Sequence, residues 1–255
     1  MKIGSDYLQK YNALDSWLNK SSQKENFIKI LSTYKQVSET ESPSAKTEEV
    51  NEIKKEKTIS EKLIGAAENY IGKKYDEVDC YELVVESLEK SGVNYKGQNG
   101  IASYLAMKAK SNKLPVNAYM TGEGLVAAAG SHVYSKSIDT VDDPVAISRK
   151  IAAEMENKLE KGSILSFSMQ TRGHTGIISK ADSDWTFINS GNMDHNLRES
   201  SYTKAVGEEP LEAEILNWLQ LAARKKESLT ITLGKFDDQK IASFVDNEKK
   251  ISMKV

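Results

Sequence analysis

The stretch Tyr75-Asp-Glu-Val-Asp-Cys-Tyr-Glu-Leu-Val-Val-Glu-Ser-Leu-Glu89 holds the only cysteine of the chain, Cys80, where a polar turn gives way to an apolar repeat. Leu83, Val84 and Leu88 follow at the spacing of one helix face, which predicts a helix that begins at Cys80. A thiol in the first turn of a helix lies among unpaired backbone N–H groups, at the positive end of the helix dipole. Both favour the thiolate, so the sequence predicts a lowered thiol pKa and a candidate nucleophile.

The composition narrows the class of protein. Of 255 residues, 39% are hydrophobic and 28% are charged, which is typical of a soluble globular protein. A formal net charge of −2 gives no electrostatic reason to expect nucleic acid as a partner. A single cysteine excludes an internal disulfide framework and an all-cysteine metal site. The sequence has no apolar run of membrane-helix length and no signal-peptide core, so we expect a cytoplasmic location or export by a signal-independent route.

The chain divides by composition into three parts. Residues 1–37 alternate polar and apolar side chains, which predicts a helical segment and a candidate for binding a protein partner or secretion machinery. Residues 38–57 have almost no apolar side chains, which predicts a flexible linker. Residues 58–255 are expected to form the main domain, with insertions at about 94–160 and 191–227.

Within the main domain, predicted helices precede predicted strands, which is an α+β pattern. We expect helices at 60–71, from 80 to near 92, and at 101–110, 143–159 and 211–226, and strands at 163–169, 173–179, 185–190 and 229–233. The short polar connections between the first three strands predict an antiparallel meander. We expect residues 121–124 to form a turn and 191–210 to be irregular, with a candidate edge strand at 241–255.

A thiol nucleophile needs a base, and the base needs a third group that holds it in the required tautomer. Histidine suits this task because its pKa lies near neutrality, and the chain has three: His132 in an expected loop, His174 at the start of a predicted strand, and His195 in a polar stretch. A hairpin of the second and third strands would place His174 near Asn189, an amide in an otherwise apolar run. An amide oxygen that accepts from the imidazole would satisfy Asn189 and orient the ring.

Four motifs stand in a familiar order: Asp79-Cys80 at a helix start, Lys161-Gly-Ser-Ile-Leu-Ser-Phe167, His174-Thr-Gly-Ile-Ile178 and Phe187-Ile-Asn-Ser190. In this order they resemble the NlpC/P60 cysteine peptidases, a family of the papain-like group. The resemblance implies an α+β papain-like core in which the cysteine helix packs on an antiparallel sheet, with helical insertions. It also implies Cys80 as nucleophile, His174 as base and Asn189 as the orienting residue.

The same resemblance implies hydrolysis of an amide bond through an acyl-enzyme, with a peptidoglycan stem peptide as substrate and with no cofactor or metal. It implies that Tyr75 polarises the scissile carbonyl beside the Cys80 backbone N–H, and that Asp79 and Tyr81 line the same place. The sequence departs from the family at Tyr81-Glu82, where the family has Ser-Gly. We therefore expect a bulkier, more acidic rim and a substrate preference set by these two residues.

Several alternatives stay open. Cys80 is also compatible with a buried structural thiol, although its combination with His174 and Asn189 favours catalysis, and Tyr75 is compatible with simple packing. His195, beside Asp194, is an alternative orienting residue, or a metal ligand together with Cys80 and His174, although no ligand spacing supports a metal site. Within the enzymes, the alternative is an effector- or toxin-like amidase, deamidase or acyltransferase that acts on a protein. Outside the enzymes, it is a catalytically silent binding domain with the same fold.

Overall fold

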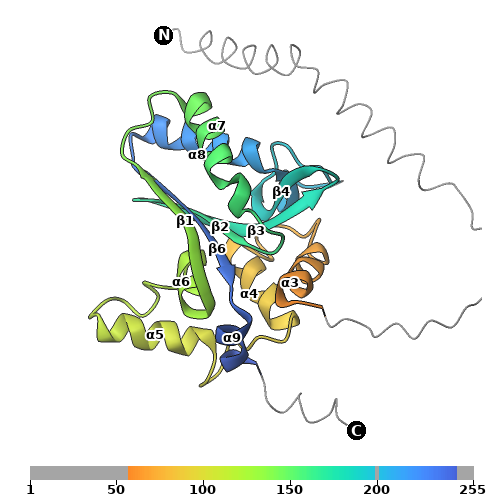
Figure 1. The fold of residues 1–255 in the computed structure, drawn as a ribbon, viewed down its shortest axis with the longest axis vertical. Helices are drawn as coiled ribbons and strands as arrows, with labels where there is room; N and C mark the ends of the chain where they lie inside the picture. Colours follow the sequence, from red (N-terminus) through yellow and green to blue (C-terminus); the bar gives the residue numbers. More distant parts are fainter. Residues whose placement is uncertain (1–56, 199–200, 246–255) are drawn as a thin grey trace, which may run out of the picture. The chain divides into compact units, whose positions relative to one another are not determined.

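The computed structural model in Figure 1 describes residues 57–198 and 201–245. These belong to one compact unit, Lys55–Val255. The expected helical segment at 1–37 and nearly all of the expected linker lie outside the described residues. The described residues form an α+β structure with seven α-helices and one six-stranded antiparallel sheet. No helix among them is both long enough and apolar enough to cross a membrane.

The helices are α3 (Ile59–Glu68), α4 (Cys80–Lys90), α5 (Ile101–Ser111), α6 (Gly122–Ala129), α7 (Pro144–Met155), α8 (Leu211–Lys225) and α9 (Asp238–Ile241), with 3-10 turns η1 (Glu156–Lys158) and η2 (Ala242–Phe244). The strands are β1 (Gly130–Ile138), β2 (Ile164–Met169), β3 (Gly173–Ala181), β4 (Asp184–Asn192), β5 (Lys204–Pro210) and β6 (Leu229–Phe236). Their order in the sheet is β1-β6-β2-β3-β4-β5. Strands β2 to β4 form the expected meander, and β5 extends it by one strand.

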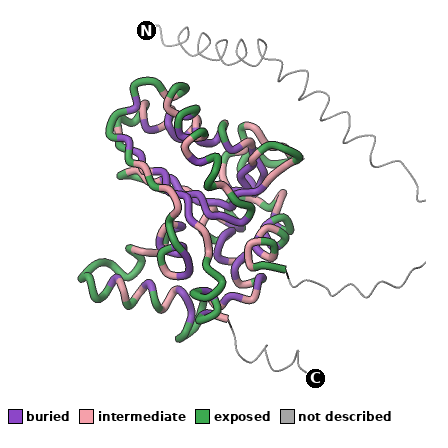
Figure 2. The backbone as a smooth tube through the Cα atoms, in the orientation of Figure 1, coloured by how far each residue is buried: buried purple, intermediate pink, exposed green. Residues whose placement is uncertain are grey.

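Helices cover both faces of the sheet. Helices α3 to α6 lie on one side, and α7 and α8 lie on the other (Figure 1). Neighbouring strand residues alternate between two apolar cores: Ile164, Ile177 and Ile188 pack with α3 to α6, whereas Leu165, Ile178 and Phe187 pack with α7 and α8. Burial on both faces makes the sheet the most buried layer of the described chain (Figure 2).

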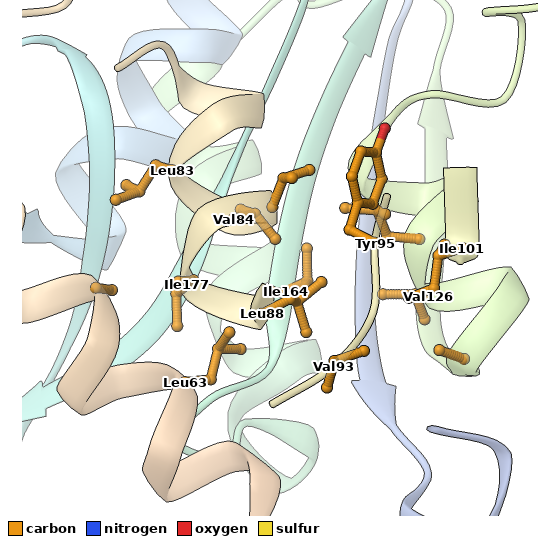
Figure 3. Packing of buried hydrophobic residues seen from close by; sticks show 14 of the residues in the cluster. Leu63, Leu83, Val84, Leu88, Val93, Tyr95, Ile101, Val126, Ile164 and Ile177 are labelled. Carbon is orange, nitrogen blue, oxygen red and sulfur yellow. The ribbon is translucent and has the colours of Figure 1, made fainter. Parts of the chain in front are cut away.

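Helix α4 begins where the sequence predicts, and its first turn is fully capped. The Asp79 side chain accepts hydrogen bonds from the backbone N–H groups of Tyr81 and Glu82, both at 2.8 Å. The Glu82 carboxylate in turn accepts from the Asp79 N–H at 3.0 Å, which completes a capping box. The apolar face of α4 then packs on the sheet through Leu83, Val84, Leu88 and their neighbours (Figure 3).

The stretch expected to turn at 121–124 instead begins helix α6. The Thr121 side chain accepts from the Gly124 N–H at 3.1 Å, so it caps the helix. The glycine after it serves close packing: a Cβ on Gly122 would lie 2.2 Å from the hydroxyl oxygens of Ser166 and Thr175. The sequence signal for a turn was therefore a signal for close approach of α6 to the sheet.

Other expected elements also differ from the structure. His132, expected in a loop, lies in β1, and part of the stretch expected to be irregular forms β5. The helix expected at 143–159 ends at Met155 and continues as η1. Residues 241–244 are helical rather than extended, and 246–255 lie outside the described residues. Strands β1 and β5 were missed because serine, lysine and glutamate dilute their apolar signal.

Replacing Gly122 by alanine should lower the free energy of unfolding by about 1–3 kcal/mol, because the new methyl group overlaps two buried hydroxyls. Gly65 in α3 is the matched control, since a Cβ there meets nothing within 4 Å. Gly65→Ala should raise stability by about 0.5–1 kcal/mol. Urea unfolding of both variants checks this, and equal effects would contradict the close approach of α6.

Candidate functional site

The Cys80 thiol is partly buried at the first residue of α4. Burial raises its pKa above the usual value, and the Asp79 charge adds to that effect. The backbone N–H groups of Thr175, Tyr81 and Cys80 itself face the thiol and lower the pKa, but by less. The lowered pKa expected from the helix terminus is therefore wrong: desolvation outweighs the terminus, and the resting group is a thiol.

His174 lies on β3, and its side chain is 9% exposed. The hydrogen bond expected from the hairpin is present: His174 Nε2 lies 3.1 Å from Asn189 Oδ1. Asn189 is 1% exposed, and its Nδ2 donates to Glu209 Oε2 at 3.2 Å and to the Phe187 carbonyl at 3.5 Å. Because its Nδ2 faces two acceptors, its oxygen faces the imidazole. An amide oxygen only accepts, so Nε2 carries the hydrogen and Nδ1 keeps a lone pair.

Aromatic side chains enclose the imidazole. Trp218 of α8 stacks on it, with ring centroids 5.5 Å apart and planes 18° apart, and Phe187 meets its edge at 5.9 Å. The Trp218 indole N–H donates to Glu214 Oε1 at 2.8 Å, and the same oxygen lies 3.7 Å from His174 Nε2. Burial lowers the pKa of His174 to about 4, although the Asn189 hydrogen bond and the Asp79 charge act in the opposite direction. The imidazole is thus neutral at pH 7.

Burial also raises the pKa of Glu214 to about 8, and the neighbouring Glu209 carboxyl contributes to this rise. Desolvation disfavours the charged forms of His174 and Glu214 alike. Their contact at 3.7 Å is therefore a meeting of two neutral groups near pH 7 rather than an ion pair.

The thiol and the imidazole are associated with helices on opposite faces of the sheet. His174 stacks on α8, whereas Cys80 opens α4 on the other face. Thr175, the residue after His174, presents its N–H to the thiol. The β3–β4 ladder ends at the Gly176–Asn189 pair, so the two strands part beside His174. The fold brings Cys80 against the neighbour of His174, but no hydrogen bond joins thiol and imidazole among the described residues.

Of the residues expected around the oxyanion, Tyr75 lies near the thiol, whereas Asp79 and Tyr81 are engaged in structural hydrogen bonds. Tyr75 is 39% exposed, and the pKa of its hydroxyl is raised first by burial and then by Cys80, which places it near the thiol. Asp79 and Glu82 are engaged in the capping box. The Tyr81 hydroxyl pairs with that of Tyr95 at 3.0 Å, and its ring packs against the core. Tyr81 and Glu82, which were expected to form an acidic rim, thus make structural contacts that the sequence did not predict.

The other two histidines lie apart from this arrangement. His132 Nε2 lies 3.0 Å from the Glu123 carbonyl on the α6–β1 side. His195 donates its backbone N–H to Glu209 Oε1 at 2.8 Å, and its ring charge also acts on the Glu209 carboxyl. Of the two candidates for orienting His174, Asn189 therefore makes the contact. Among the described residues, no group of three or more His, Cys, Asp or Glu side chains could hold a metal ion.

Sequence reasoning missed four residues of the site: Ser190, Glu209, Glu214 and Trp218. Glu214 and Trp218 are four residues apart on the buried face of α8, and a glutamate on an apolar helix face was a signal that could have been used. The Ser190 hydroxyl donates to the Val78 carbonyl at 2.5 Å, so the residue after Asn189 holds the turn that leads into Cys80.

Comparison with known proteins adds no identification: no protein-family model, no curated protein and no solved structure matches the chain. The fold and site define an α+β protein in which a helix-start thiol lies beside a buried His–Asn pair.

Ser190→Ala should lower the free energy of unfolding by about 1–3 kcal/mol, because it leaves the buried Val78 carbonyl without its donor. Ser87 on α4 is the matched control, since it is equally buried and its hydroxyl has no partner. Ser87→Ala should leave stability unchanged or raise it. Denaturant midpoints test this prediction. A larger loss of stability in Ser87→Ala than in Ser190→Ala would contradict the stabilising role of the Ser190–Val78 hydrogen bond.

Glu214→Gln should become increasingly more stable than the wild type as pH rises. The folded-state pKa of Glu214 is raised to about 8 from 4.5, so its stabilising contribution is complete below pH 4.5 and is lost as pH rises through 8. Glutamine keeps an acceptor for Trp218 but does not ionise. Between pH 4.5 and pH 8, the difference in the free energy of unfolding between the variant and the wild type, from urea unfolding, should change by on the order of a few kcal/mol. A constant difference would show that Glu214 titrates normally.

Proposed function

We propose that the chain is a cysteine hydrolase with a papain-like core, which cleaves an amide bond through an acyl-enzyme on Cys80. The observation that carries this proposal is the state of His174. Its Nε2–H is held by Asn189 Oδ1, so the basic Nδ1 remains available beside the residue whose N–H faces the thiol. A neutral base of fixed tautomer, whose neighbour on β3 faces a cysteine at a helix start, supports an assignment to thiol catalysis.

The proposed reaction uses a neutral thiol and a neutral imidazole. His174 Nδ1 takes the proton from Cys80 Sγ as the sulfur attacks the substrate carbonyl carbon. The carbonyl oxygen becomes an oxyanion that the Cys80 N–H and the Tyr75 hydroxyl stabilise. The imidazolium then gives its proton to the leaving amine, and the C–N bond breaks to leave a thioester. A water molecule, deprotonated by His174, attacks the thioester carbonyl. The C–S bond then breaks to release the carboxylic acid, and the imidazolium returns its proton to the Cys80 sulfur.

The resting site has to tighten for this reaction. Because no hydrogen bond joins Cys80 to His174, the thiol and Nδ1 must approach when substrate binds, as catalytic groups often do. The imidazolium that forms would lie between the Asn189 oxygen and Glu214 Oε1, at 3.1 and 3.7 Å from Nε2. Substrate that displaces water from the partly buried thiol would strengthen these interactions.

The substrate proposed first is a peptidoglycan stem peptide, on the strength of the NlpC/P60 resemblance of the four motifs. Neither of two surface cavities, of about 460 and 490 Å³, includes Cys80 in its lining. In this proposal an extended peptide lies over the exposed Tyr75, which is near the thiol.

A second candidate function is a catalytically silent binding domain. Two observations favour it: burial raises the pKa of the Cys80 thiol, and the thiol has no hydrogen bond to His174. In this case the buried His–Asn pair would serve only to fill the interior between β3, β4 and α8.

Cys80→Ala should abolish release of stem peptides from purified sacculi, and His174→Ala should reduce it by about 10²–10⁴-fold, because the attacking thiol loses its base. Released peptides are measured by chromatography and mass spectrometry. His132→Ala is the matched control, since this histidine lies apart from the site and should leave the rate unchanged.

The outcomes separate the candidates. In one outcome, the wild-type protein releases nothing from sacculi yet hydrolyses a broad panel of acyl probes through Cys80. This result would indicate that the substrate is a protein rather than peptidoglycan. No reaction with any of these substrates, in a protein shown to be folded, would support the silent domain. Equal activity in Cys80→Ala would overturn the proposed function.

A further inference from the structure

Strand β5 places two consecutive glutamates, Glu208 and Glu209, in the interior, each 1% exposed. A buried carboxylate is costly unless its oxygens are matched by donors. Glu208 has a cation: Arg198 contacts its Oε2 at 2.6 Å, and Thr186 donates to its Oε1 at 2.6 Å. Glu208 is therefore explained as half of an ion pair.

Glu209 has no such explanation. Among the described residues it pairs with no lysine or arginine, and its two oxygens each accept from a neutral donor. The His195 backbone N–H contacts Oε1 at 2.8 Å, and Asn189 Nδ2 contacts Oε2 at 3.2 Å. Burial raises its pKa and these two donors lower it, while the charges of the His195 ring and of Asp194 add smaller effects, the first lowering and the second raising the pKa. The carboxyl has its donors, but they do not explain why a carboxyl is needed there.

We propose that Glu209 is a positioning residue that fixes the tautomer of His174 through Asn189, so that the site is a relay of four residues. The reason is that two successive groups, the Glu209 carboxylate and the Asn189 amide oxygen, can only accept hydrogen bonds. A carboxylate cannot donate, so the NH2 side of the Asn189 amide must face Glu209. The amide oxygen then faces His174 and cannot donate either, so His174 must carry its hydrogen on Nε2.

Without Glu209, the amide of Asn189 can turn over. Its NH2 group would then face Nε2, and the imidazole hydrogen would move to Nδ1, the atom that has to accept the thiol proton. The Phe187 carbonyl opposes this only weakly, at 3.5 Å from Nδ2. Glu214 is the other titratable group that faces Nε2, but its near oxygen already accepts from Trp218. The mechanistic meaning of the relay rests on the proposed function, whereas the tautomer itself does not.

The test is the imidazole nitrogen spectrum of the full-length protein labelled with ¹⁵N. Only three histidines contribute, and His132→Ala and His195→Ala assign the signals. Wild-type His174 should show a single Nε2–H tautomer at pH 7. Glu209→Gln keeps the shape but has one acceptor oxygen for two donors, so it should show a mixture or the reverse tautomer. Glu208→Gln, which changes the neighbouring buried carboxylate, should leave the His174 tautomer as in the wild type.

A pure Nε2–H tautomer in folded Glu209→Gln would overturn the proposal. If that variant does not fold, the wild type still decides: the Asn189 NH2 protons should show nuclear Overhauser contacts to the Glu209 side chain. Contacts to the His174 ring instead would show that the amide is reversed and would overturn the relay. A lower kcat with unchanged KM in Glu209→Gln would add the catalytic consequence. Failure of the proposed function would appear separately, as activity in Cys80→Ala.

Discussion

The hydrogen bond between His174 Nε2 and Asn189 Oδ1 is the interaction on which the rest of the site depends. It joins β3 to β4 where their backbone ladder stops, and it defines the tautomer of a buried imidazole. The Asn189 amide donates to Glu209, and the His174 ring stacks on Trp218. Each partner would be a costly buried polar group alone, and together they satisfy one another.

A sheet that is buried on both faces makes this arrangement possible. Consecutive residues of β4 point to opposite faces, so Asn189 orients His174 on the α8 side while Ser190 holds the Val78 carbonyl on the α4 side. In β3, the His174 side chain stacks on Trp218, and the Thr175 N–H, which lies beyond the end of the β3–β4 ladder, faces the Cys80 thiol. His174 and Thr175, adjacent on β3, thus place the imidazole and the donor that faces the thiol. The geometry of the candidate site therefore depends on the register of the sheet.

The sequence was sufficient for the parts of the fold that depend on local pattern. The helical spacing of Leu83, Val84 and Leu88 predicted α4, and runs of β-forming residues predicted β2 to β4. The same hairpin register predicted the contact of His174 with Asn189. The sequence failed where tertiary burial decides: the pKa of Cys80 rises because the helix start is desolvated, and β5 was missed because its buried glutamates resemble a polar loop. Gly122 was assigned to a turn because the sequence alone does not distinguish a glycine in a turn from one that packs closely against Ser166 and Thr175.

The most direct test of the central claim is to look for the acyl group on Cys80. Wild-type protein mixed with sacculi and quenched in acid should give a Cys80 peptide whose mass is increased by a stem-peptide acyl group, and His174→Ala should give little or none within the same time. An adduct that forms equally well in His174→Ala would contradict the assignment of His174 as the base. Release of stem peptides by wild-type protein with an unmodified Cys80 at every quench time, and undiminished release by Cys80→Ala, would contradict the account as a whole.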